Sequence, residues 1–241
     1  MPEAGLRLAL FDCDGTLIDS QHTIIASMAA AFAAIGLAAP AAEQVRRVVG
    51  LKLDLAIAEL AAGLAAGLEM DAVDSAVDAY LAAFQALHSD PAHQEPLYDG
   101  MLGTLDALEA DGWLLGIATG KSHRGLISTL DRHGLRPRFA TLQTADQAAS
   151  KPSPEMVLRA LAETGVALAR VVVIGDTGFD IGMAANAGVR SIGVGWGYHP
   201  LGELSAAGAT RTASACADLP ALLNALVPPL VPGPAPTRVP K

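Results

Sequence analysis

The sequence predicts an α/β fold in which helices cover both faces of a parallel β-sheet and a helical segment follows the first strand. Short aliphatic runs alternate with helical segments through residues 97–227, and the crossover connections between such elements make successive strands parallel. Residues 21–87 differ, because their Ala-rich helical patterns contain no run typical of a strand. A helical insertion therefore separates the first strand from the rest of the sheet.

Each element has its own signal in the sequence. Residues 6–11 form an aliphatic run that ends in the polar turn Asp-Cys-Asp-Gly-Thr, which predicts the first strand. In residues 21–87 apolar residues recur at spacings of three and four, as in helices, between glycines and a proline. Residues 88–96 are polar, contain two prolines and are typical of a linker. Later strands are expected at residues 113–118, 139–143, 171–175 and 191–194, and helices at residues 101–110, 122–133, 154–164 and 181–187.

These elements divide the chain into three parts. Residues 1–18 and 97–227 would form the α/β core, and residues 19–96 the helical insertion with its linkers. Six of the 15 prolines fall within residues 227–241, which excludes a helix or a central strand there. We expect residues 228–241 to form a flexible, Pro-rich tail.

Composition and charge exclude several classes of protein. With 51% hydrophobic and 17% charged residues the chain is globular, and its two cysteines are too few for a disulfide framework. Sixteen basic residues against 25 acidic ones give a formal net charge of −9, and the basic residues form no run, so we expect no nucleic-acid partner. The start lacks a signal-peptide pattern, and charges interrupt every apolar stretch, so we expect a cytoplasmic protein without a membrane partner. The pattern favours no particular oligomeric state.

Polar side chains follow the predicted strands, where ligands bind in an open parallel sheet. They comprise four carboxylates, two lysines and a threonine, to which Gly120 adds its backbone N–H: Asp12, Asp14, Thr119, Lys121, Lys151, Asp176 and Asp180. Carboxylates gathered in one place repel one another unless a hard cation neutralises them, and an oxygen-only set without His or Cys suits Mg²⁺. A threonine hydroxyl, backbone N–H groups and a lysine ammonium are the groups that hold phosphate oxygens. The sequence therefore predicts a site for Mg²⁺ and phosphate.

Four motifs resemble, in order, those of the haloacid dehalogenase superfamily. The first, Asp-x-Asp-Gly-Thr after a strand, is found at residues 12–16, and the second is Thr119 at a strand end. The third is Lys151 followed by proline, and the fourth is Gly-Asp at residues 175–176 with a further Asp180. The resemblance covers nearly the whole chain up to the tail. It implies a Rossmann-like core with an α-helical cap, as in the phosphoglycolate-phosphatase-like branch of the superfamily.

The resemblance also implies roles for these residues. Asp12 would attack phosphorus and form an aspartyl-phosphate, and Asp14 would protonate the leaving alcohol and then activate water. Thr119 and Gly120 would hold phosphate oxygens, while Lys151 would orient Asp12 and offset its charge. Mg²⁺ would be held by Asp12, the backbone carbonyl of Asp14, Asp176 and Asp180.

The implied activity is the Mg²⁺-dependent hydrolysis of a small phosphorylated metabolite, with phosphoglycolate as the first candidate and pyrophosphate and sugar phosphates as others. In the cap, Arg46, Arg47 and Lys52 around Gly50 are the expected contacts of the leaving group. Of these, Arg46 and Lys52 are the predicted substrate-binding residues. A Gly-rich segment is expected to line the entrance of the site through Trp196, Tyr198 and His199.

Several alternatives stay open. Residues 116–122 resemble a phosphate-binding loop of nucleotide hydrolases, but three residues separate their glycines where that loop requires four. A binding module without turnover would not need Asp14, and a dehalogenase would need neither Asp14 nor a metal. A phosphonate hydrolase would use Lys52 to form an imine, and a phosphomutase shares all four motifs. Cys13 is interpreted as a buried thiol without a catalytic role.

Overall fold

A computed structural model describes residues 5–63, 68–90 and 92–230. It contains one six-stranded sheet in the order β3-β2-β1-β4-β5-β6, and every neighbouring pair is parallel. The strands are β1 (Arg7–Phe11), β2 (Trp113–Thr119), β3 (Phe139–Thr144), β4 (Val171–Gly175), β5 (Arg190–Val194) and β6 (Arg211–Ala213). The predicted fold class is confirmed.

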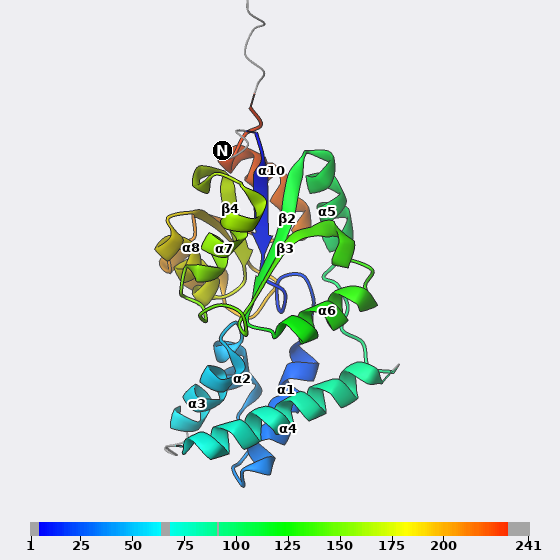
Figure 1. Cartoon of the computed structure of the whole chain (residues 1–241), viewed down its shortest axis with the longest axis vertical. Helices are drawn as coiled ribbons and strands as arrows, with labels where there is room; N and C mark the ends of the chain where they lie inside the picture. Colours follow the sequence, from blue (N-terminus) through cyan, green and yellow to red (C-terminus); the bar gives the residue numbers. More distant parts are fainter. Residues whose placement is uncertain (1–4, 64–67, 91, 231–241) are drawn as a thin grey trace, which may run out of the picture.

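Helices cover both faces of the sheet, as the apolar runs of its strands require. In β1, Leu8 and Leu10 pack into one core cluster and Ala9 and Phe11 into the other, because side chains alternate along a strand. Figure 1 shows helices on the two sides of the sheet. The first cluster contains residues of α7 (Glu155–Thr164) and α8 (Gly178–Ala187), and the second contains residues of α5 (Met101–Ala110), α6 (His123–Arg132) and α10 (Leu219–Leu226).

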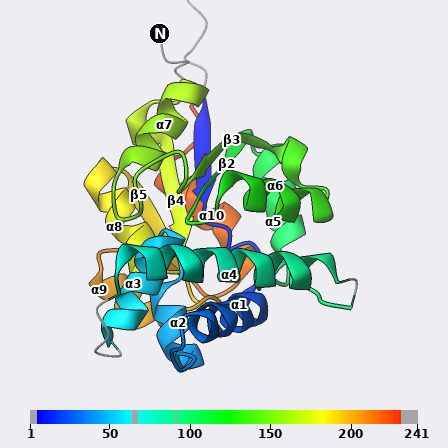
Figure 2. The same cartoon turned by 60° about the horizontal axis from the view of Figure 1, so that its bottom comes forward.

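Four helices lie together beyond one end of the sheet, and we call them the cap (Figures 1 and 2). They are α1 (Gln21–Ala34), α2 (Ala42–Val48), α3 (Leu53–Gly63) and α4 (Met70–Ser89). The cap has a hydrophobic core of its own, to which α1 contributes Ile24, Met28 and Phe32 at four-residue spacing along one face. Leu51, between α2 and α3, lies against Gly120, which directly follows β2, so the cap lies at the carboxyl ends of the strands.

The structure contains elements that the sequence did not indicate. Strand β6 has three residues, two of them exposed, so no apolar run marks it. The helix α9 (Leu201–Ala206) precedes β6 in the chain, and α10 follows it. Beyond residue 230, the tail expected at residues 228–241 lies outside the described residues. In the described part of the chain no helix is both long and apolar enough to cross a membrane.

The separate core of the cap can be tested with Phe32, which is fully buried. We expect Phe32→Ala to lower the free energy of unfolding by about 3–5 kcal/mol, because it removes transfer energy and leaves a cavity. Urea unfolding followed by far-UV circular dichroism would measure the change. The control is Leu158→Ala on α7, where the side chain is 50% exposed and the expected change is within about 0.5 kcal/mol. Equal effects of the two substitutions would contradict a packed cap core.

Candidate active site

The site begins at the two central strands of the sheet. The chain order of the strands reverses between β1 and β4, and such a switch point opens a crevice beyond the strand ends. Asp12 follows β1, and its N–H donates a hydrogen bond to the carbonyl of Ile174 in β4 at 2.8 Å. Asp176 directly follows the last residue of β4. The two strand ends therefore place both carboxylates side by side.

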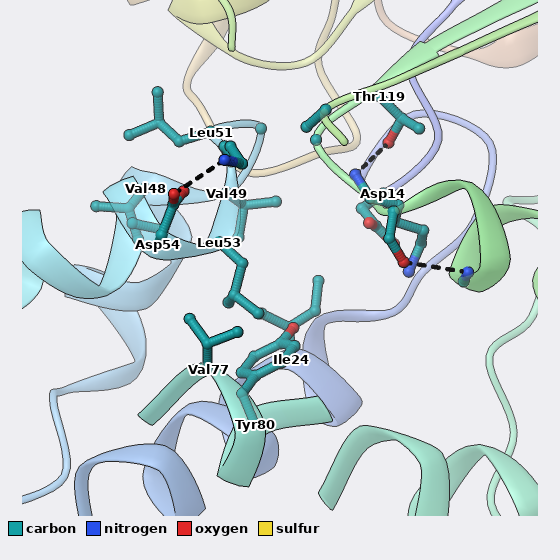
Figure 3. Close-up of a pocket in the computed structure, with 18 of the residues that line it drawn as sticks. Asp14, Ile24, Val48, Val49, Leu51, Leu53, Asp54, Val77, Tyr80 and Thr119 are labelled. Atoms are coloured by element: carbon teal, nitrogen blue, oxygen red, sulfur yellow. Dashed lines mark hydrogen bonds and ion pairs between the residues drawn. The ribbon is translucent and has the colours of Figure 1, made fainter. Parts of the chain in front are cut away.

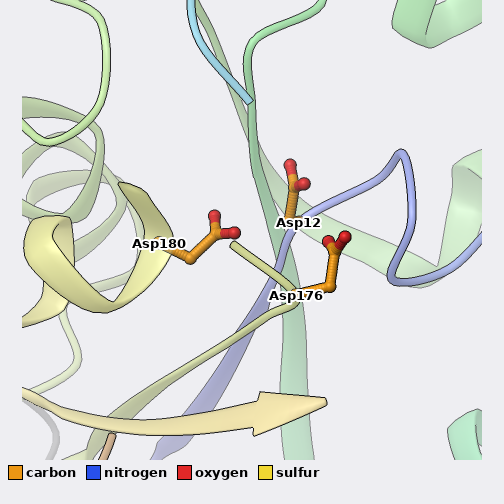
Figure 4. A group of neighbouring side chains, drawn as sticks. All are labelled: Asp12, Asp176 and Asp180. Carbon is orange, nitrogen blue, oxygen red and sulfur yellow. The ribbon is translucent and has the colours of Figure 1, made fainter. Parts of the chain in front are cut away.

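A third carboxylate completes a buried acidic cluster. Asp180 lies in the first turn of α8, and one oxygen each of Asp12, Asp176 and Asp180 lie within 4.8 Å of one another. All three side chains are at most 2% exposed. Figure 4 shows them directed from two strand ends and a helix into one space.

Lys151 is the cation within this cluster. Its Nζ lies 2.7 Å from Oδ1 of Asp12 and 2.6 Å from Oδ1 of Asp180, and the side chain has no exposed surface. Burial alone would lower the pKa of Lys151, but the charges of the two carboxylates outweigh burial and raise it. One ammonium group thus faces three carboxylates in a buried space.

Burial and the excess of negative charge raise the pKa values of two of the aspartates. Burial, opposed by Lys151 and aided by the charge of Asp180, raises the pKa of Asp12 to about 7. Burial and the charges of its two neighbours also raise the pKa of Asp176. Oδ2 of Asp12 is buried and has no hydrogen-bond partner among the described residues. A divalent cation that prefers oxygen ligands would satisfy this atom and stabilise the ionised carboxylates, so the residues fit Mg²⁺.

Asp176 and Asp180 are fixed by hydrogen bonds to their surroundings. Asp176 accepts one from the hydroxyl of Thr16 at 2.8 Å and one from the backbone N–H of Tyr198 at 2.9 Å. Oδ2 of Asp180 accepts from the N–H and the hydroxyl of Thr177, at 3.1 and 2.7 Å, in a capping box that begins α8. These hydrogen bonds orient both carboxylates.

Two glycines make room for Asp176. A Cβ atom on Gly15 or on Gly197 would overlap the Asp176 side chain, and Gly15 also has a φ of +84°, which favours glycine. Gly15 belongs to the Asp-x-Asp-Gly-Thr motif, whereas Gly197 carries no motif signal. The close approach of three loops to one carboxylate explains both.

Asp14 lies apart from the acidic cluster. Its Oδ1 accepts a hydrogen bond from the hydroxyl of Ser20 and lies 3.0 Å from Nζ of Lys121. The same Nζ lies 4.5 Å from the ring centroid of Phe84 in the cap. Cys13, which lies between Asp12 and Asp14 in the sequence, is fully buried in the same core cluster as Phe11. This agrees with its interpretation as a buried thiol. Burial raises the pKa of the Cys13 thiol, which keeps it protonated.

The ion pair between Lys121 and Asp14 was not anticipated from the sequence. Lys121 follows Thr119 and Gly120 at the end of β2, and this position at a strand end could have indicated that it belongs to the site. Thr119 is 1% exposed, and its hydroxyl accepts a hydrogen bond from the N–H of Lys121 at 3.3 Å. Gly116 lies inside β2, so residues 116–122 begin in a buried strand and do not form a phosphate-binding loop.

A cavity of about 330 Å³ lies between the cap and these residues (Figure 3). Asp12, Asp14, Thr119 and Gly120 line its core side. A Cβ atom on Gly120 would lie 2.5 Å from the carbonyl oxygen of Leu51, so this glycine lets the cap loop contact the core. The cavity therefore has the cap on one side and the predicted catalytic aspartates on the other.

The cap cations take different positions. Arg46 donates to Gln21 at 3.1 Å and pairs with Glu43, and it is not among the described residues that line the cavity. Lys52 does line the cavity, with its Nζ 3.0 Å from Asp54. Arg47 forms ion pairs with Glu43 and, across to α9 of the core, with Glu203.

The segment expected at the entrance has another position. Nε1 of Trp196 donates to the carbonyl of Thr16 at 3.0 Å, Tyr198 is buried, and Nδ1 of His199 accepts from the N–H of Gly178. These three side chains are absent from the described lining of the cavity. The segment instead packs against Asp176, to which the N–H of Tyr198 donates a hydrogen bond.

Comparison with known proteins agrees with this geometry. A family model described as haloacid dehalogenase-like hydrolase matches residues 9–194. A probable phosphatase, IndB, of Dickeya dadantii is 34% identical over 204 residues, which cover 83% of this chain and 86% of that protein. A phosphoglycolate phosphatase of Agrobacterium fabrum is 31% identical, with 79% and 81% covered. An N-acetylmuramic acid 6-phosphate phosphatase of Pseudomonas aeruginosa is 34% identical, with 83% and 87% covered.

The fold has solved counterparts as well. The crystal structure of a hydrolase from Pseudomonas syringae has a TM-score of 0.80 to this chain at 24% identity, and the match covers 91% of this chain and 98% of that one. The sheet, the order of the four motifs and the family match all agree. The chain belongs to the family of haloacid dehalogenase-like hydrolases.

Proposed function

We propose that this protein is a Mg²⁺-dependent phosphatase that hydrolyses small phosphomonoesters through an aspartyl-phosphate on Asp12. The observation that carries the proposal is the buried cluster of three aspartates with Lys151, in which one oxygen of Asp12 has no hydrogen-bond partner and Asp12 lines the cavity beneath the cap. The names of the relatives support phosphate esters as substrates, including phosphoglycolate. Hydrolysis of a phosphoryl group needs positioning and charge more than covalent chemistry, and this cluster supplies both.

In the first step an oxygen of Asp12 attacks phosphorus. The bond from phosphorus to the alcohol oxygen breaks, and Asp14 gives its proton to that oxygen, so the alcohol leaves neutral. Lys151 holds Oδ1 of Asp12 and fixes the orientation of the carboxylate. Thr119, Gly120 and the backbone around them contact the phosphate oxygens at the end of β2.

In the second step the Asp14 carboxylate takes a proton from water. The water oxygen bonds to phosphorus, the bond from phosphorus to Asp12 breaks, and inorganic phosphate leaves with Asp12 regenerated. Ser20 and Lys121 position Asp14 for both steps through their contacts with Oδ1.

Asp12, Asp176, Asp180 and the backbone carbonyl of Asp14 would hold the metal ion. When bound, Mg²⁺ supplies positive charge that stabilises the ionised aspartates and the transferring phosphoryl group. The hydrogen bonds to Asp176 and Asp180 orient those ligands in advance.

The requirement for metal is directly measurable. We expect phosphate release from p-nitrophenyl phosphate to need Mg²⁺, to stop in chelator and to be inhibited by Ca²⁺, whose larger and looser coordination shell misplaces the reacting groups. Full activity in chelator would indicate a dehalogenase-like mechanism and contradict the proposal.

Replacing the nucleophile separates catalysis from folding. We expect Asp12→Asn to lower turnover on the order of 10³-fold or more, because an amide is a far poorer nucleophile. In chelator its melting temperature should equal or exceed that of the wild type, since one of three crowded negative charges is gone. Asp78→Asn, on an exposed residue of α4, is the matched control and should change neither quantity. A folded Asp12→Asn protein with wild-type turnover would refute Asp12 as the nucleophile.

A further inference from the structure

The cavity that leads to Asp12 shows which leaving groups the site can hold. Its core side carries the reacting groups, so the alcohol part of a bound ester extends toward the cap (Figure 3). The nature of the cap wall therefore selects the alcohol.

The cap wall is apolar. Two helices contribute large apolar or aromatic side chains: Ile24 and Met28 from α1, and Val77, Tyr80, Leu81 and Phe84 from α4. The four residues of α4 follow the spacing of a single helix face, so they form a continuous surface. Figure 3 shows Ile24, Val77 and Tyr80 on the side of the cavity opposite Asp14 and Thr119.

The connection between α2 and α3 extends this wall. Val48, Val49, Leu51 and Leu53 line the cavity next to the helices. The wall is thus mainly apolar from α4 to the loop that touches Gly120, with Lys52, Asp54 and Asp74 as its charged residues. A hydrophobic group of the substrate would be removed from water on all these sides.

Each cation of the described wall already has a carboxylate partner within the protein. The cationic side chains among the lining residues are Lys52 and Lys121, and each has its Nζ 3.0 Å from a carboxylate, of Asp54 and Asp14 respectively. Asp74 and Asp146 add further negative charge to the lining. A carboxylate on the leaving group would lose its water and meet apolar side chains, which is costly without a partner.

We propose that the leaving group of the substrate is an uncharged, mainly apolar alcohol considerably larger than glycolate. A cavity of about 330 Å³ lies at the lower end of the range of ligand pockets, about 300–1,000 Å³, and is roomy for an ester as small as phosphoglycolate. This inference rests on the proposed function, because it assumes that the ester is cleaved at Asp12. It departs from the phosphoglycolate expectation, for which Arg46 and Lys52 were to supply the cap contacts.

A pair of matched esters tests this inference. Pentyl phosphate and its analogue with a carboxylate in place of the terminal methyl group have the same chain and the same type of leaving oxygen. With Mg²⁺ we expect kcat/KM to be about tenfold or more higher for pentyl phosphate than for the carboxylate analogue, and higher than for phosphoglycolate. Equal or reversed preferences would overturn the inference.

A change in the wall provides a second readout. Val77→Lys places a cation on the apolar α4 face and should shift the preference about tenfold toward the carboxylate analogue. Val73→Thr, on the same helix but not among the described lining residues, is the control and should keep the wild-type preference. An unchanged preference in folded Val77→Lys protein would also overturn the inference.

Acetyl phosphate separates this inference from the proposed function, because its small leaving group does not reach the cap wall. Wild-type protein that hydrolyses acetyl phosphate with Mg²⁺ but shows no preference for pentyl phosphate would refute the leaving-group inference alone. Wild-type protein that hydrolyses none of these compounds would refute the proposed function, and the inference with it.

Discussion

The site depends on one buried ammonium group shared between two carboxylates. Lys151 pairs with Asp12 and Asp180, so a loop, a strand end and a helix, which are distant in sequence, meet at one atom. Charges this deeply buried are tolerated only when they are paired and hydrogen-bonded. Because Asp176 adds a third carboxylate, the pairing is incomplete in the protein alone. In the proposed function a divalent cation would make up this shortage, and its charge would also offset that of the phosphoryl group.

The rest of the molecule divides the work between two layers. The parallel sheet, packed on both faces, fixes the strand ends and therefore the reacting groups. The cap has its own core and contacts the core domain at Gly120 and Lys121, through the loop at Leu51 and through Phe84 of α4. In the proposed function, chemistry and selection of the leaving group come from these separately packed elements. We therefore expect a substitution in the cap wall to change the substrate preference without disturbing the acidic cluster.

Much of the core was predictable because short patterns encode it. A parallel strand that is buried on both faces reads as an aliphatic run, and the residue after it faces the crevice, so Asp12 and Asp176 could be placed from local sequence. The position of Lys121 after a strand was predictable from the sequence, but its ion pair with Asp14 depends on how β2 lies beside β1. The apolar cap wall could not be foreseen, because alanine-rich helices give little indication of which face meets the core. Arg46 illustrates the same difficulty, since its neighbour Gln21 is distant in sequence.

The central claim, that Asp12 carries the phosphoryl group, has a direct measurement. In an Asp14→Asn variant the water of the second step lacks its base, while p-nitrophenolate leaves without needing a proton. This variant is mixed with p-nitrophenyl phosphate and Mg²⁺ and quenched in acid, and its peptides are analysed by mass spectrometry. We expect a phosphoryl group on Asp12. A double variant that also carries Asp12→Asn should show none. Phosphate release by the Asp14→Asn variant without a phosphorylated peptide, or with the group on another residue, would contradict the account.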